Sequence, residues 1–252
     1  MTTSPILRAA STRRAVYLVR KESPMMKPGP LHVVACPSCK ALAWYAMAFS
    51  GNTFGARRWT DGKMIAPMCP QPPSFVRCGS CGSLYWLDEA EQKGTFDPLS
   101  SIGDNPRLRS APGVEEPSEA EYYEALEIPP KDPYRELELR TLAWWKSNDP
   151  HRGPKGGQVV RFGDDAPPPT EDEAEPAPPH EGRVPNMEAL AAILDESNDG
   201  ALLMKAELLR ELGCFPEALA LLDRIQDEQL RKLAELFRGY CNAGDSALHV
   251  LL

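Results

Sequence analysis

Two different spacings of apolar residues divide the chain. In residues 185–252, apolar side chains recur at i, i+3, i+4 and i+7, the period of one face of an α-helix. The stripes are Met187, Leu190, Ala191 and Leu194; Leu202, Ala206 and Leu209; Leu219, Leu222 and Ile225; and Leu230, Leu233, Ala234, Phe237 and Cys241. Gly213 can end the second helix, and Asp227 can cap the fourth. The pattern predicts antiparallel helices joined by short loops.

Short apolar runs separated by turn residues fill residues 31–96. Residues 31–35, 75–76 and 83–87 predict short strands, because they are rich in β-branched and aromatic side chains. Glycine and asparagine mark turns after the apolar segment 40–49, so one or two β-hairpins are expected there. Residues 88–94 predict a short helix or a turn. This part of the chain is expected to be a small β module.

Proline and capping residues define the elements between these two parts. Four prolines interrupt residues 97–117, which predicts a loop. Ser118 and Glu121 form the S-x-x-E pattern of a capping box, which predicts a short helix that ends at the following proline pair. Asp132 followed by proline predicts the start of a second helix over residues 133–147.

The predicted fold class is α+β, a small β module plus a C-terminal α-helical module. Residues 150–184 separate helical parts and are rich in proline, glycine and acidic residues. Such a segment cannot bury enough apolar area to offset its loss of conformational entropy, so it is expected to be disordered. The expected organisation is a disordered extension (1–30), the β module (31–96), a helical segment (97–149), the linker (150–184) and a helical module (185–252).

Composition and charge restrict the function classes. Proline accounts for 26 of 252 residues, about twice the usual share of ~5%, which fits segments outside a packed core. The longest apolar run, residues 42–49, is far shorter than the ~20 residues that span a bilayer. Lys and Arg outnumber Asp and Glu 14 to 7 in residues 1–110, but are outnumbered 29 to 14 in residues 111–252. The overall charge of -8 argues against a general nucleic-acid coat, whereas the N-terminal part could attract an anionic partner.

The first residues leave two interpretations open. Residues 1–24 contain four arginines and no acidic residue before Glu22, a composition typical of transit peptides. The alternative is a start codon assigned too early, because Met25 and Met26 stand just before the first motif. No apolar stretch with a small-residue cleavage site follows, so a cytoplasmic location is expected.

Two C-x-x-C pairs carry the clearest chemistry. An odd total of seven cysteines does not fit a secreted disulfide framework. Four of them pair as Cys36 with Cys39 and Cys78 with Cys81. Two thiolates two residues apart can bind one ion from a tight turn, and two such turns complete the tetrahedron that zinc prefers. The sequence predicts a metal site on these four cysteines, with zinc as the cofactor.

These paired motifs resemble a zinc ribbon and, more distantly, rubredoxin. The resemblance covers roughly residues 31–90 and implies a structural metal held by two hairpins, with no open coordination position for catalysis. It departs from the family in one respect, because 38 residues separate Cys39 from Cys78, against ~15–20 in the common spacing. An inserted hairpin or loop must fill this interval. Iron could use the same ligands.

A redox alternative starts from the same first motif. A strand, the sequence CPSC and an apolar segment that could be helical are similar to the start of a glutaredoxin or thioredoxin. A cysteine at the start of such a helix would have a lowered pKa. Zinc is favoured, because that family does not require the second C-x-x-C and no clear βαβ pattern follows. Cys69 is expected to be an idle thiol, and His32 is not assigned to the metal.

Basic and aromatic residues between the two motifs raise a further hypothesis. Arg57, Arg58, Trp59 and Lys63 could contact phosphate groups and stack on bases. A solvated hairpin surface with one packing aromatic is the favoured interpretation, because the chain has no long basic stripe. A nucleic-acid-associated factor remains the alternative.

Residues 206–225 resemble one tetratricopeptide helical hairpin. Ala206, Gly213, Phe215 and Ala218 stand where that family places its small residues, its turn glycine and its aromatic residue. Such arrays usually need about three units for stability, so the flanking helices must supply the missing surface. The resemblance implies binding of peptides or partner proteins.

No motif for catalysis emerges, and no catalytic residue is assigned. The four histidines are scattered, and the chain has no phosphate-binding glycine motif and no H-E-x-x-H. The predicted function is therefore a non-enzymatic, zinc-binding protein-interaction or scaffold protein. Its expected partners are a protein bound by the C-terminal helices and, in the alternative, a nucleic acid bound by the N-terminal module.

Overall fold

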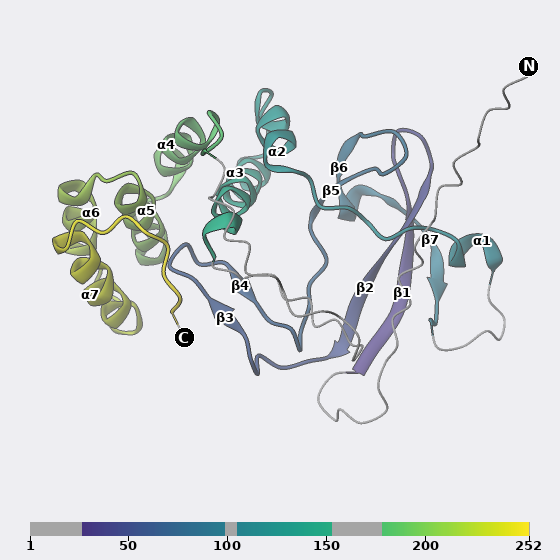
Figure 1. The fold of residues 1–252 in the computed structure, drawn as a ribbon, viewed down its shortest axis with the longest axis horizontal. Helices are drawn as coiled ribbons and strands as arrows, with labels where there is room; N and C mark the ends of the chain where they lie inside the picture. Colours follow the sequence, from purple (N-terminus) through teal and green to yellow (C-terminus); the bar gives the residue numbers. More distant parts are fainter. Residues whose placement is uncertain (1–26, 99–104, 153–177, 252) are drawn as a thin grey trace, which may run out of the picture.

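The computed structural model describes residues 27–98, 105–152 and 178–251. The largest antiparallel sheet lies towards one end of the molecule, and most of the helices lie towards the other (Figure 1). The described part is an α+β protein, as predicted. The expected extension over residues 1–26 and most of the expected linker, residues 153–177, lie outside the described residues.

The largest sheet has three antiparallel strands. Its centre is β1 (Lys27–Ala35), which pairs with β2 (Leu42–Ser50) on one side and β7 (Glu91–Phe96) on the other. Val33 and Val34 of β1 are 0% exposed, the position that β-branched side chains favour. The predicted strand at residues 31–35 is thus confirmed as the centre of this sheet.

Several segments differ from the sequence predictions. Residues 106–109, within the segment 97–117 expected to be a loop, form a short helix whose N-cap is Asn105. Residues 27–30, predicted as the end of the disordered extension, are the start of β1, because their backbone runs beside the end of β2. Residues 88–94, predicted as a helix or a turn, divide between the 3-10 turn η1 (Leu87–Glu89) and β7. Glu91 pairs with Ala35 while its side chain points to solvent. Pairing with a buried neighbouring strand overrides the polar composition of this segment.

A second hairpin joins this sheet to the helices. It is formed by β5 (Phe75–Arg77) and β6 (Leu84–Trp86). The extended residues 112–115 hold it beside β2, because Trp44 N donates to Pro112 O at 2.8 Å and Arg77 N donates to Glu115 O at 2.9 Å. One stretch of backbone therefore fastens both sheets.

Three helices follow the sheets in the chain. They are α1 (Pro106–Arg109), α2 (Glu119–Leu126) and α3 (Pro133–Asn148). The predicted capping box of α2 is present, and the side chain of Asp132 caps α3 as expected. Helices α2 and α3 pack on the β5–β6 hairpin through a shared apolar cluster. Its buried members are Phe75, Trp86, Tyr122, Leu139 and Ala143.

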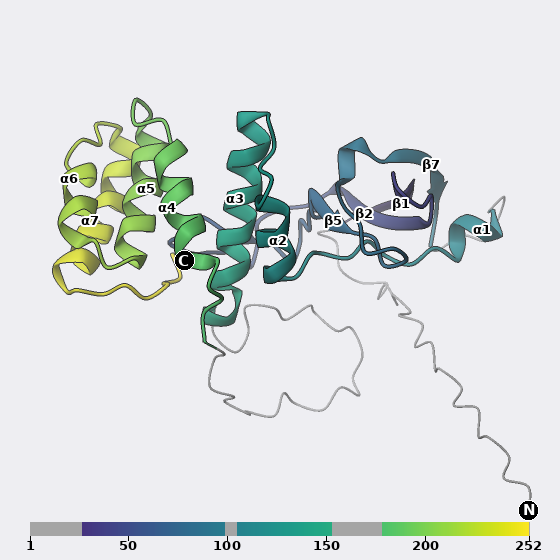
Figure 2. The ribbon, with the colours of Figure 1, turned by 90° about the horizontal axis from the view of Figure 1, so that it is seen from above.

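The C-terminal helices form a stack beside α3. They are α4 (Arg183–Ile193), α5 (Asp199–Glu211), α6 (Phe215–Leu222) and α7 (Glu228–Asn242). Figure 2 shows α2 and α3 lying between the sheets and these four helices. Trp144 of α3 is buried in one cluster with Leu190 of α4 and Leu208 of α5. The helices on either side of residues 153–177 are therefore direct neighbours.

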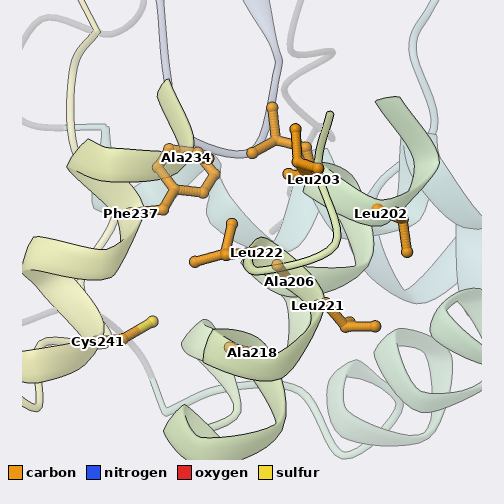
Figure 3. Packing of buried hydrophobic residues seen from close by; sticks show 10 residues of the cluster. Leu202, Leu203, Ala206, Ala218, Leu221, Leu222, Ala234, Phe237 and Cys241 are labelled. Carbon is orange, nitrogen blue, oxygen red and sulfur yellow. The ribbon is translucent and has the colours of Figure 1, made fainter. Parts of the chain in front are cut away.

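The predicted helical stripes form the core of the stack. Leu222 of α6 and Phe237 of α7, both 1% exposed, face each other in Figure 3. Ala206 of α5 and Ala218 of α6 are 1% and 0% exposed, so two small side chains lie where these helices approach. Gly213, at φ 77°, makes the tight turn between them, which a residue with a Cβ would adopt only at a cost.

The long interval between the cysteine pairs contains an inserted hairpin, as the spacing predicts. Its strands are β3 (Arg57–Arg58) and β4 (Met64–Ile65). This hairpin reaches away from the large sheet to the helices (Figure 1). Its β3 side also receives the C-terminal tail, because Thr60 N donates to His249 O at 2.9 Å and Leu251 N donates to Arg58 O at 2.7 Å.

Candidate metal centre

The four predicted cysteines lie together. The Sγ atoms of Cys36, Cys39, Cys78 and Cys81 are all within 4.8 Å of one another. Cys36 follows β1 and Cys78 follows β5, so each hairpin contributes one pair from the turn between its two strands. The sulfur of Cys36 is 3.9 Å from that of Cys81, and the sulfur of Cys39 is 3.6 Å from that of Cys78.

The two cysteine turns have the same backbone geometry. In the first, Cys36 N donates to Ala41 O at 2.9 Å and Lys40 N donates to Cys36 O at 3.0 Å. In the second, Cys78 N donates to Ser83 O at 2.9 Å and Gly82 N donates to Cys78 O at 2.8 Å. Two separate C-x-S-C segments therefore present their thiols in equivalent positions.

The donor set fits a single tetrahedral ion. A tetrahedron with metal–sulfur bonds of ~2.3 Å has sulfur–sulfur edges of about 3.8 Å, close to the 3.9 and 3.6 Å observed. A disulfide would need ~2.05 Å, and all four thiols are free. The four could hold one metal ion, and four protein ligands would fill its tetrahedral coordination.

Burial divides the cluster into an inner and an outer pair. Cys36 and Cys78 are 1% and 5% exposed and pack with Val34, Val76 and Tyr85 in one apolar cluster. Cys39 and Cys81 are exposed. A metal here would join the core of the large sheet to the core of the β5–β6 hairpin.

The electrostatics of the cluster favour a cation. Burial raises the pKa of the Cys78 thiol to about 11, although backbone N–H groups of Cys81 and Ser80 oppose it. The hydroxyl and then the backbone N–H of Ser83 lower the pKa of Cys81 to about 6. Burial, followed by the negative charges of the cysteines, raises the pKa of Tyr85 to about 12. Several thiolates at this distance repel one another, and a metal ion would remove that repulsion.

The redox alternative required a helix after the first motif, and that requirement is not met. Residues 42–50 form β2, because their backbone pairs with β1 along its length. Cys36 therefore does not stand at the N-terminus of a helix. Cys69 lies outside the cluster, with its sulfur 3.6 Å from Gln71 Nε2. His32 stacks on Tyr45, with ring centroids 5.2 Å apart.

The four basic and aromatic residues of the hairpin do not form one exposed patch. Arg57 and Arg58 are exposed, but Trp59 is only 1% exposed and offers no free face for a base. The ammonium group of Lys63 is 2.6 Å from Asp149 Oδ1. Nucleic-acid binding stays a prediction that would rest on the two arginines.

The hairpin tip is held by a buried group of polar and aromatic residues, which we call the hairpin junction. Its members are Trp59, Thr60 and Asp61 of the tip, Trp145 and Asn148 of α3, and Arg152, which follows the 3-10 turn η2 (Asp149–His151). Arg152 binds both carboxylate oxygens of Asp61, and these side chains are 1% and 0% exposed. The Arg152 guanidinium also lies 4.9 Å from the centre of the Trp59 ring.

Sequence reasoning missed this junction. Asp61 precedes a glycine, a pattern typical of a turn, and Arg152 stands in the segment 150–184 whose composition predicts a linker. Asp61 and Arg152 stand 91 positions apart in the chain, so no local sequence pattern connects them. The aromatic Trp59 within a polar hairpin was the available signal for a buried surface.

A second buried carboxylate lies beside the junction. The side chain of Glu211 is 1% exposed, and it accepts hydrogen bonds from Trp144 Nε1 at 3.0 Å and Asn148 Nδ2 at 3.1 Å. Burial raises its pKa to about 7, and the charges of Glu207 and Asp61 add to the effect. The Trp144 and Asn148 donors oppose the shift without cancelling it.

We expect Glu211 to make stability fall as the pH rises from about 5 to 7. The pKa of Glu211 is higher in the folded than in the unfolded chain. The protonated side chain therefore contributes its full stabilisation at a pH below the unfolded-state pKa, and this contribution is lost as the pH rises through the folded-state pKa. A shift of this size corresponds to up to about 3 kcal/mol. Glu211→Gln should remove the slope, with exposed Glu217→Gln as the control. Urea unfolding at several pH values checks this, and parallel curves for wild type and Glu211→Gln would contradict it.

Lys40 offers a smaller test of the cysteine turns. It adopts φ 63° where the equivalent Gly82 of the second turn has φ 75°, and a side chain in this region costs about 1–2 kcal/mol. Lys40→Gly should raise stability by about 0.5–1 kcal/mol after the added freedom of the unfolded chain is subtracted. Gly82→Ala should lower the stability. An added Cβ has room at this site, but the positive φ of residue 82 strains any residue with a side chain. Urea midpoints of the metal-loaded variants measure both effects. A lower stability of Lys40→Gly would refute the strain ascribed to the backbone of Lys40.

Comparisons with known proteins identify no relative. No protein-family model, no curated protein and no solved structure matches the chain. Within the residues that the structure describes, none of the helices has the length and apolar character needed to cross a bilayer.

Proposed function

We propose that this chain is a non-enzymatic zinc-binding protein whose helices bind a partner protein. The observation that carries the metal part is the cluster of four thiols with tetrahedral spacing. Thiolates are soft ligands, and four of them favour zinc or iron over magnesium or calcium. Zinc is proposed because a closed four-thiolate site supplies folding energy without any redox change.

The proposed architecture is a zinc-ribbon-like module joined to tetratricopeptide-like helices. The β1–β2 and β5–β6 hairpins, each with a cysteine turn, support the first part. The close packing of α5 on α6 at Ala206 and Ala218 supports the second. We further propose that the protein works in the cytoplasm, where a reducing environment keeps these thiols free for a metal.

Metal analysis of the purified full-length chain tests the proposal. One zinc per chain is expected, and its release with a chelator should free four thiols for titration. Cys69→Ser is the matched control, because Cys69 lies outside the cluster, and it should keep its zinc. An absence of bound metal after purification and zinc reconstitution would overturn the proposal, and one iron with a visible charge-transfer band would replace zinc by iron.

The interaction part needs its own test, because the metal result does not address it. The full-length chain is expected to bind a protein through its helical face, and Leu236 of α7, which is 42% exposed, lies on the outer side of the stack. Leu236→Glu should weaken capture of that protein while metal content stays at one per chain. If Leu236→Glu and a chain lacking residues 183–252 both captured the protein as strongly as the wild type, a role for the helices would be refuted.

A further inference from the structure

One inserted segment connects the cysteine cluster to the hairpin tip. Its 38 residues begin after Cys39 and end before Cys78, whose sulfur atoms are 3.6 Å apart. Its middle, the hairpin tip, lies among the helices instead of on the large sheet (Figure 1). The two ends of this loop therefore meet at the candidate metal site, and its centre meets the helical part.

Contacts with α3 fix one side of the tip. Trp145 Nε1 donates to the backbone oxygen of Asp61 at 2.9 Å, and Asn148 Nδ2 donates to Asp61 Oδ2 at 3.2 Å. Arg152 Nη1 donates to Asp61 Oδ1 at 3.1 Å. A carboxylate that is 0% exposed needs the Asn148 and Arg152 donors, because a buried charge without them is strongly unfavourable.

The C-terminal tail fixes the other side of the tip. His249 O accepts from Thr60 N at 2.9 Å, and His249 N lies 3.3 Å from Thr60 Oγ1. The tail itself is held by α5, because Arg210 donates to Ala247 O at 2.8 Å and to Asp245 O at 2.5 Å. The tip therefore fits one position, and it can occupy that position only while its two arms are correctly placed.

A metal would place the arms by closing the loop. Without it, the β1–β2 and β5–β6 hairpins are joined by apolar contacts, by residues 112–115 and by the short connection through η1 from β6 to β7, which pairs with β1. A clip that joins the ends of a long loop reduces the number of conformations that the loop must lose on docking. A docked tip, in turn, holds the two cysteine turns near each other before the metal arrives.

We infer that the metal site and the hairpin junction form a metal-sensitive latch. Metal binding favours the docked hairpin, and the docked hairpin raises the affinity of the cysteines for the metal by the same factor, because such coupling is reciprocal. The inference rests on the proposed zinc site and adds its regulation. Loss of the metal would release the tip and expose Trp59 together with the side of α3 that it covers.

The latch is tested by changing the helical side and measuring the metal. Zinc affinity is determined by competition with a chromophoric chelator for the full-length wild type, Arg152→Ala and Trp145→Phe. Arg152 is far from the cysteines in the sequence, and Trp145→Phe removes one hydrogen bond while keeping a ring. The affinity is expected to fall by about 5- to 150-fold in Arg152→Ala and by less in Trp145→Phe. Arg238→Ala, which removes an exposed ion pair with Asp223, is the control.

The reverse direction is measured by hydrogen exchange at the tip. The amides of Thr60 and Leu251 should exchange faster after the metal is removed, whereas amides inside α7 should not. Equal zinc affinities in all four proteins, or unchanged exchange at Thr60 and Leu251, would overturn the latch while leaving the zinc site intact. A wild type that binds no zinc would instead overturn the proposed function as well. Trp145→Phe keeps the test decisive if Arg152→Ala does not fold.

Discussion

Cys78→Ser is expected to unfold the three-stranded sheet and the β5–β6 hairpin, while α5, α6 and α7 keep their structure. Cys78 is 5% exposed and lies in the apolar cluster with Val34 and Val76. A serine there loses one metal ligand and buries a hydroxyl, and structural zinc sites of this kind contribute on the order of 10 kcal/mol. That exceeds what a module of this size gains from its own core.

Circular dichroism and hydrogen exchange of the full-length variant separate the two parts. Protection at Val33 and Val34 should disappear, and protection in α7 around Phe237 should persist. Cys69→Ser, which changes a cysteine outside the cluster, should behave like the wild type. Retained protection of β1 in Cys78→Ser would show that the sheets are stable without the fourth ligand and that the metal is not structural.

Arg152→Ala should have the next largest effect on stability. It leaves the carboxylate of Asp61, 0% exposed, without its main partner, and breaking a buried pair in this way typically costs 3–5 kcal/mol. Exposed ion pairs are worth about 0–1 kcal/mol, so Arg238→Ala should change the free energy of unfolding far less. Urea unfolding at a fixed zinc concentration compares the two variants directly.

A double-mutant cycle shows whether the cost comes from the pair itself. Asp61→Asn combined with Arg152→Met removes both charges and keeps most of the volume. The double variant should be more stable than Arg152→Ala, because no unpaired charge remains in the interior. If the effects of the two changes simply add, the charges act independently and the junction is not held by their pairing.

The sequence predicts features whose cause is local. The capping box of α2 and the Asp132 cap of α3 depend on residues two or three positions apart, and both are present. The helical stripe with Leu222 and the stripe with Phe237 are both buried for the same reason. The cysteine cluster was also predictable, because each C-x-x-C pair is local and a shared ion explains why two pairs should meet.

Features that depend on distant pairing were not predictable. The polar residues of β7 become a strand because the neighbouring β1 offers hydrogen-bond partners. Lys63 looks accessible in a polar hairpin, but Asp149, which binds its ammonium group, stands 86 positions later in the chain. The groups that lie against Trp59, the Arg152 guanidinium and the C-terminal tail at Val250, come later still. Burial of Asp61 was hidden for the same reason, since its partner Arg152 stands in a segment whose composition predicts a linker.

The separation of these contacts along the chain sets an order of assembly during protein synthesis. The sulfur pairs join residues 39 and 45 positions apart, so the cysteine cluster can close while later parts are still being translated. Thr60 meets His249 across 189 positions, and ribosomes add ~5–20 residues per second. The nascent hairpin therefore waits many seconds for the C-terminal tail that completes its contacts.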